Sequence, residues 1–240
     1  MAALLGLWEV AGRSGGLLLA PFSATVGALW ELTTNGELPQ AFLLSNTALV
    51  LGLALTLPLG LVVGLALGRF RTLDRWLGIF LDIAIVTPGI ALVPVIVVAL
   101  GIGLTARVMM VVFFAVPFLI VNLRTGVRGV DARFIEMARS FGASELQLWW
   151  RILLPGMLPA LAAGLRVATS RAVVGMIIVE LTLVSVGLGS LIQTNRALFI
   201  PAKVFAVTAV IIIEGLVLLR ITREIEWRIA ARGLHGTGAS

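Results

Sequence analysis

Long apolar runs alternate with short polar segments along the whole chain. A helix of about 20 apolar residues is long enough to cross a bilayer. Five runs meet this requirement or come close to it, at residues 43–68, 81–100, 105–123, 157–184 and 201–219. The pattern predicts an all-α polytopic membrane protein whose transmembrane domain extends over residues 43–232. The Gly-rich end, residues 233–240, is predicted to be a disordered tail.

Residues 1–42 are predicted to form a short N-terminal helix and an interfacial segment. The apolar run at 2–10 is too short to span, so it is either the end of a longer helix or a short interfacial helix. The run at 14–34 contains a proline and ends in polar residues. We expect a re-entrant or interfacial segment here, with a short helix near 23–32. A full span is the alternative, because the length just suffices.

The predicted spans differ in their internal residues. Small residues on one helix face let a neighbouring backbone approach closely, and this favours helix packing over a pore role. In the first span they recur at every fourth position: Gly52, Thr56, Gly60, Gly64 and Gly68. The second span contains Pro88 and Pro94, which membrane helices tolerate but which can kink them.

The basic residues are unevenly divided between the two predicted faces of the membrane. Segments on one face hold 12 of the 18 Lys and Arg residues, whereas the other face holds only Arg13, Arg107, Arg196 and Lys203. An excess of positive charge marks the cytoplasmic side, so the C-terminus is expected inside. The net charge of +6 thus reflects topology. Nucleic-acid binding is not expected, because no basic stripe is interleaved with exposed aromatics.

Residues 131–155 are a charged island between two apolar runs, and they read as folded helix. Gly142 is expected to end a first helix. Ser144 begins a second, with Gln147 completing a capping box, and Pro155 is expected to close it. A loop that folds in this way favours binding of another protein, with packing beneath its own bundle as the alternative. The first helix carries one apolar stripe, Phe134, Ile135, Ala138 and Phe141.

Several chemistries are excluded by the inventory of residues. There is no G-x-x-x-x-G-K-[ST] motif, and the single lysine lies on the predicted outer face, so no P-loop is present. There is no cysteine, and the single histidine, His235, lies in the tail. We therefore expect no metal site, no catalytic residues and no cofactor in this chain.

The island also carries a recognisable pattern, E-A-A-x3-G-x9-I-x-L-P, from which only Met137 departs. It resembles the EAA loop of the permease subunits of bacterial type I ABC importers. With the segments GLRVA and GLGSLI further on, the chain looks like the nitrate/sulfonate/taurine group. Members usually have six spans, so the first helix here is cut short or the chain is a five-span variant. The matching positions are Glu136, Ala138, Gly142, Ile152, Leu154 and Pro155, with Arg139 as a rim contact.

The resemblance implies a function and a set of partners. The EAA helix would be the coupling helix that docks on a dimer of ATPase subunits, which bind ATP and Mg²⁺. A second permease chain, identical or different, and an extracytoplasmic binding protein would complete an importer in the bacterial inner membrane. The substrate expected is a small solute, either an anion such as nitrate, sulfonate or taurine, or a vitamin precursor. The alternative is a membrane scaffold or receptor that does not transport.

The last two predicted spans contain ionisable residues well inside the membrane, where burying a charge is costly. Arg166 is expected to snorkel to the cytoplasmic interface. Arg171 lies deeper and either pairs with Glu214 or lines the path and attracts an anionic substrate. Glu180 is expected near the outer end, as part of a gate or of the scaffold.

Overall fold

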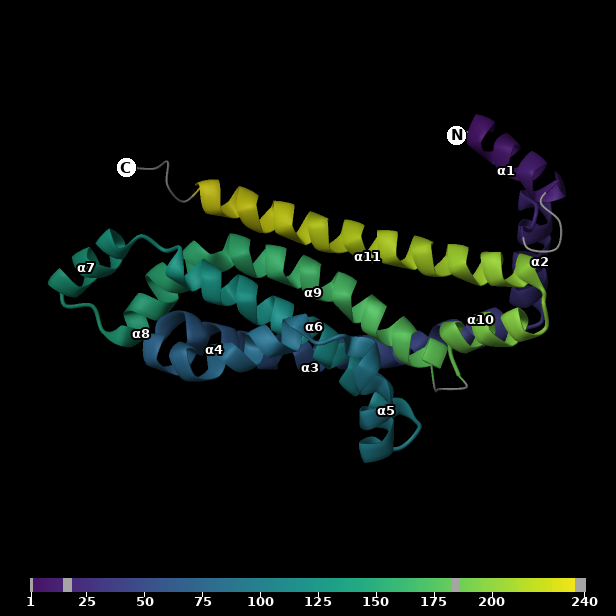
Figure 1. Cartoon of the computed structure of the whole chain (residues 1–240). Helices are drawn as coiled ribbons and strands as arrows, with labels where there is room; N and C mark the ends of the chain where they lie inside the picture. The colour runs from purple at the N-terminus through teal and green to yellow at the C-terminus, as the bar shows by residue number, and fades with distance from the viewer. Residues whose placement is uncertain (1, 15–18, 183–185, 236–240) are drawn as a thin grey trace.

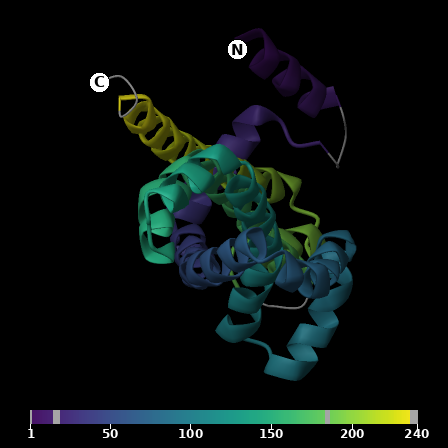
Figure 2. The ribbon, with the colours of Figure 1, turned by 90° about the vertical axis from the view of Figure 1, so that its left-hand side faces the viewer.

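The computed structural model describes residues 2–14, 19–182 and 186–235, and in these ranges every regular element is a helix. Four helical stretches are long and apolar enough to cross a membrane: Glu37–Arg69, Leu104–Arg128, Glu145–Thr182 and Pro201–Arg228. They run side by side along one axis, with α7 and α8 at one end and α2 and α10 at the other (Figure 1). The end-on view in Figure 2 shows them as a bundle.

The middle of the bundle is α6 (Leu104–Arg128), which packs against α3 (Glu37–Arg69) and α9 (Leu154–Thr182). The small-residue face of α3 meets α6, as the four-residue spacing predicts. A Cβ atom added at Gly64 would lie 2.8 Å from Leu123, and one added at Gly68 would lie 2.7 Å from Val127. The two backbones are therefore as close as glycine allows.

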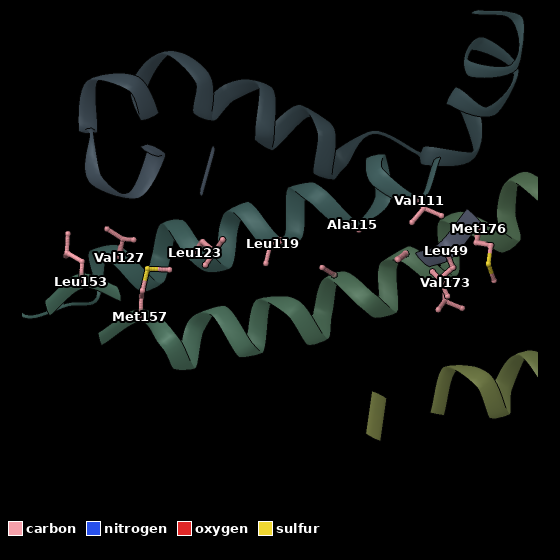
Figure 3. Close-up of a cluster of buried hydrophobic side chains, with 12 residues drawn as sticks. Leu49, Val111, Ala115, Leu119, Leu123, Val127, Leu153, Met157, Val173 and Met176 are labelled. Atoms are coloured by element: carbon pink, nitrogen blue, oxygen red, sulfur yellow. The ribbon is translucent and has the colours of Figure 1, made fainter. Parts of the chain in front are cut away.

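A row of buried apolar side chains fills the space between α6 and α9, from Leu153 and Val127 at one end to Met176 at the other (Figure 3). Leu119 and Leu123, in the middle of this row, have no exposed surface. Close-packed interiors resist changes of even one methylene group, so we expect the interface between α6 and α9 to tolerate few substitutions.

The structure differs from the prediction of one span at 81–100. Two helices occupy this region, α4 (Arg71–Val86) and α5 (Gly89–Leu100), bent by 103° at a break between them. The residue before a proline is pushed out of the helical region, and Thr87, which precedes Pro88, is extended with ψ 125°. Pro94, by contrast, lies inside α5 without ending it.

Two short helices, α1 (Ala2–Ser14) and α2 (Phe22–Thr34), precede the bundle. The α2 helix agrees with the short helix predicted near 23–32, and its 13 residues are too few for the alternative of a full span. The Trp8 indole donates to the Ala20 carbonyl (3.0 Å). Glu9 accepts from the backbone N–H of Ser23 (2.9 Å), so α1 caps the start of α2.

The last helices are α10 (Leu188–Ala197) and α11 (Pro201–His235). α11 is longer than the span predicted at 201–219. Lys203 at its start forms an ion pair with Glu31 of α2 (2.7 Å). Of the predicted disordered tail, residues 233–235 are helical, and residues 236–240 lie outside the described part of the chain.

Candidate functional site

The island folds first into α7 (Ala132–Ser140), whose two ends are capped as the sequence dictates. The Asp131 carboxylate accepts from the backbone N–H of Arg133 (2.9 Å) at the start. At the end, Gly142 has φ +76°, and the N–H of Ala143 donates to the Ala138 carbonyl (3.0 Å). This is the Schellman arrangement, so the predicted stop at Gly142 is confirmed.

The second helix of the island, α8 (Glu145–Leu148), begins with the predicted capping box of Ser144 and Gln147. The prediction that Pro155 closes this helix is wrong. A π-helical turn, Trp149–Leu153, joins α8 to α9 without a break, and Pro155 lies in the first turn of α9. Proline has no N–H to donate, and the π turn before it already shifts the helical bonding, so the chain passes through.

The apolar stripe predicted on α7 does not form a single face: some of its side chains point outward and others point toward the bundle. Phe134, Met137 and Phe141 point outward, and Phe141 is 85% exposed. Ile135 and Ala138 are half-buried, and Ile135 packs against the core cluster between α6 and α9. One side of α7 therefore rests on the bundle, while the other presents an apolar surface. We call Phe134, Met137 and Phe141 the outer stripe.

The remaining EAA positions differ in burial. Glu136 and Gly142 are exposed, whereas Ile152 and Leu154 are half-buried at the junction with α9. The Arg139 guanidinium donates to the Glu145 carboxylate (2.7 Å). The other oxygen of that carboxylate accepts from Arg69 at the end of α3 (2.9 Å). The contacts of Glu145 thus link α7, α8 and α3.

A buried charged cluster lies at the opposite end of the bundle. The Glu180 carboxylate accepts from the Ser45 hydroxyl (2.8 Å) and from the backbone N–H of Gly189 (3.1 Å). It also lies 3.6 Å from the Arg107 guanidinium, which in turn donates to the Leu44 carbonyl (2.9 Å). One carboxylate thereby joins α3, α6, α9 and α10.

The Gly-Leu-Gly segment after α9 is shaped by this carboxylate. A Cβ added at Gly187 would overlap the Glu180 carboxylate, and one added at Gly189 would lie 2.5 Å from the Glu180 Cβ. Gly187 also has φ +89°, a conformation that L-residues rarely adopt. The N–H of Leu188 donates to the Ser45 hydroxyl (2.9 Å), which closes the network. Glu180 therefore positions the entry into α10.

Arg171 and Glu214 do not form the ion pair that was one of the two expectations. The Arg171 guanidinium lies 4.4 Å from the centre of the Phe118 ring, and the side chain is exposed on the surface of the isolated chain. Glu214 is 7% exposed, and neither carboxylate oxygen has a hydrogen-bond partner among the described residues. Arg166, which the sequence predicts to reach the cytoplasmic interface, pairs with Glu226 of α11 (3.2 Å).

Sequence reasoning missed the role of Arg107. The distribution of basic residues assigns it to the outer face, and the structure shows that its side chain is 6% exposed and pairs with Glu180. The sequence does contain a signal for this pair. Arg107 and Glu180 have opposite charges, and both lie near the predicted outer ends of their spans. For metals, the described ranges contain no group of three or more His, Cys, Asp or Glu that would hold an ion.

Comparisons with known proteins bear on this arrangement. Residues 56–230 match the model of the binding-protein-dependent transport system inner membrane component family. The putative aliphatic sulfonates transport permease protein SsuC of Escherichia coli (strain K12) is 29% identical over 87% of this chain and 80% of its own length. The riboflavin transport system permease protein RibX of Chloroflexus aurantiacus is 30% identical over 90% of this chain and 81% of its own.

The fold has a solved counterpart. A chain of the MetNI methionine ABC transporter, in inward-facing conformations, superimposes with a TM-score of 0.64 at 20% identity, covering 85% of this chain and 95% of that one. The all-helical architecture is thus that of a type I importer permease. In the matched family, permease subunits are not themselves enzymes and ATP hydrolysis belongs to a separate subunit. This chain belongs to the binding-protein-dependent transport system inner membrane component family and is the permease subunit of an ABC importer.

Proposed function

We propose that the outer stripe of α7 is the surface on which a dimer of ATPase subunits docks, and that its movement reaches the substrate path through α9. The observation that carries this proposal is the unbroken helix from Glu145 to Thr182. Its first residue is ion-paired to α7, and Glu180 near its other end holds the buried cluster. A push on α7 is therefore passed along one rigid element to the entry of α10.

The chemistry of the outer stripe supports a protein partner. Three large apolar side chains point away from the bundle on a short helix whose charged side chains, Arg133, Glu136 and Arg139, are also exposed. Aromatic anchors of this kind dominate the binding energy of interfaces, and surrounding charges contribute more to orientation. Arg133 and Glu136 flank the stripe and suit the rim of such an interface. ATP and Mg²⁺ would then be bound by the partner and not by this chain.

The distribution of arginine supports a cytoplasmic position for this surface. Arg69, Arg128 and Arg139 gather at the α7 end of the bundle, where α11 also ends (Figure 1). Positive residues are retained on the cytoplasmic side, so we place α7, α8 and the C-terminus there. The α10 end then faces the extracytoplasmic space, where a substrate-binding protein would dock.

Arg171 is the best-placed residue for contact with the substrate. It lies 11 residues before the end of α9, which is about 16 Å along a helix, and it is exposed in the isolated chain. A guanidinium at this depth is costly in lipid, so it faces water or another protein. We propose that it lines a path formed with a second permease chain and attracts the anionic group of a small solute, such as a sulfonate or a phosphorylated or carboxylated vitamin precursor.

Two measurements test the proposal. Co-purification of a nucleotide-binding subunit with the chain is expected, and its absence would contradict the docking role of the outer stripe. For the path, Arg171→Gln should lower uptake of an anionic substrate by about tenfold or more, whereas Arg171→Lys should keep a measurable part of it. Arg223→Gln, which removes an exposed arginine of α11, is the matched control and should transport normally. Equal uptake by Arg171→Gln and the control would contradict the role of Arg171.

A further inference from the structure

A cavity of about 620 Å³ lies between α7 and the adjoining ends of α3, α4 and α6. Its apolar floor includes Val127, Leu148 and Leu153. Its wall is unusually basic, with one acidic side chain, Asp74, among five arginines: Arg69, Arg71, Arg75, Arg128 and Arg139. The function described above makes no use of this cavity.

The carboxylates near the cavity are already engaged. Asp74 pairs with Arg128 (2.6 Å) and with Arg124 (2.9 Å). Glu145 pairs with two of the cavity's arginines, Arg69 and Arg139. Each carboxylate is shared by two arginines, so positive charge remains uncompensated even where ion pairs form.

Two of the wall arginines have no ion pair in the described part of the chain. Arg71 and Arg75 lie one turn apart on α4, so both guanidinium groups lie on the same side of that helix. Guanidinium groups bind phosphate through parallel N–H donors, and a pair of them on one face suits a single phosphate group. The unpaired positive charge of Arg71 and Arg75 therefore suits the binding of an anion from outside the chain.

The surroundings of these two arginines are those of a membrane interface. Phe70 and Trp76 flank them and are exposed, and Trp76 is 70% exposed. Trp side chains gather at the level of the lipid headgroups. Further along α4, Ile79, Phe80 and Ile83 are exposed apolar side chains that would lie against acyl chains. Arginines that suit a lipid headgroup and apolar side chains that suit acyl chains are thus adjacent on α4.

The cavity and the outer stripe lie on opposite sides of α7. At 100° per residue, Phe134, Met137 and Phe141 fall within about 60° of one another, whereas the cavity-lining Ile135 and Arg139 are turned away from them. A protein docked on the outer stripe would therefore leave the cavity wall free.

We propose that this cavity binds the phosphate-bearing headgroup of an anionic phospholipid, held by Arg71 and Arg75 of α4 beside Arg139 of α7. The lipid phosphate joins α4 to the helix that carries the outer stripe. Basic pockets between membrane helices at the cytoplasmic face have the chemistry that anionic headgroups require. The site does not depend on which solute is transported or on the identity of the ATPase.

Native mass spectrometry of the purified transporter, with phosphatidylglycerol and phosphatidylcholine added in equal amounts, tests this site. The wild type should retain phosphatidylglycerol in preference to phosphatidylcholine. In the variant R71Q/R75Q, the ratio of bound phosphatidylglycerol to bound phosphatidylcholine should fall by about tenfold or more. R151Q/R223Q, which removes two exposed arginines outside the cavity, is the matched control for net charge and should keep it.

A second arm of the experiment separates the two sources of phosphate. Inorganic phosphate and glycerol 1-phosphate at millimolar concentration should not displace phosphatidylglycerol, because they have no acyl chains to lie against α4. Displacement by either would assign the cavity to a soluble phosphate and overturn the proposal. Equal lipid retention by the wild type and R71Q/R75Q would also overturn it. Because the readout is bound lipid, failure here leaves the coupling role of α7 untouched.

Discussion

The Arg107 guanidinium and the Glu180 carboxylate lie 3.6 Å apart at the α10 end of the bundle, and neither side chain is more than 6% exposed. Removing one member of such a pair leaves an uncompensated buried charge, which costs about 3–5 kcal/mol. We expect Arg107→Met to lower the free energy of unfolding of the purified transporter by a similar amount. Arg107→Met combined with Glu180→Gln should recover part of the loss.

The pair of variants forms a double-mutant cycle that isolates the interaction. Thermal unfolding of the single and double variants measures it directly. Strictly additive losses would show that Arg107 and Glu180 do not stabilise one another, and the structural role given to Glu180 would then be wrong.

The backbone at Gly187 is predicted to be sensitive to any side chain. Gly187→Ala combines strain at φ +89° with overlap on the Glu180 carboxylate. Gly101→Ala is the matched control, because Gly101 has φ +79° and nothing within 4 Å of an added Cβ. Both variants should lose about 1–2 kcal/mol to backbone strain, and Gly187→Ala should lose clearly more. Similar melting temperatures for the two would contradict the contact with Glu180.

The close approach of α3 to α6 gives a second comparison of glycines. Gly64→Ala would place a methyl group 2.8 Å from Leu123, and overpacking of a tight core costs about 1–3 kcal/mol. Gly215→Ala adds the same group to α11, where nothing lies within 4 Å. Thermal unfolding should show a loss for Gly64→Ala and none for Gly215→Ala. A neutral Gly64→Ala would mean that the helices separate at no cost.

The contact between α1 and α2 should weaken at low pH. The N–H of Ser23, with help from its hydroxyl and from Arg13, lowers the pKa of Glu9 below its usual value of 4.5. A carboxylate whose pKa falls on folding contributes stability above its unfolded pKa, and that contribution disappears as pH falls through the lower, folded pKa. The protection factors of amides at the start of α2, which are corrected for the intrinsic pH dependence of exchange, should therefore fall below about pH 4.5 in the wild type. In Glu9→Gln the protection factors should be low and independent of pH over the same range, and a pH response equal to that of the wild type would contradict the cap.

Patterns confined to neighbouring residues predicted the local structure well. The stop at Gly142, the capping box at Ser144 and the small-residue face of α3 each follow from chemistry within one or two helical turns. Contacts between distant residues could not be read in the same way. The partner of Glu180 is 73 positions away, and hydropathy carries no information about which of several charges meet inside the bundle.

The prolines differ in their effect on helices, and the residues next to each proline do not predict which effect occurs. Pro88 breaks its helix, whereas Pro155 and Pro94 do not. The difference at Pro155 comes from the π turn before it, which hydropathy and residue spacing do not reveal. The division of the α7 stripe into Ile135 facing inward and Phe141 facing outward likewise depended on how the helix docks on the bundle.

The central claim is that the outer stripe of α7 carries the ATPase, and the affinity of the permease for its ATPase subunit tests it most directly. Phe141→Ser should weaken binding about thirtyfold, because removing an aromatic anchor from an interface costs about 2 kcal/mol or more. Trp30→Ala, which removes an exposed aromatic from α2 at the other end of the molecule, should bind normally. An unchanged affinity for Phe141→Ser, in a chain that inserts into the membrane normally, would contradict the account.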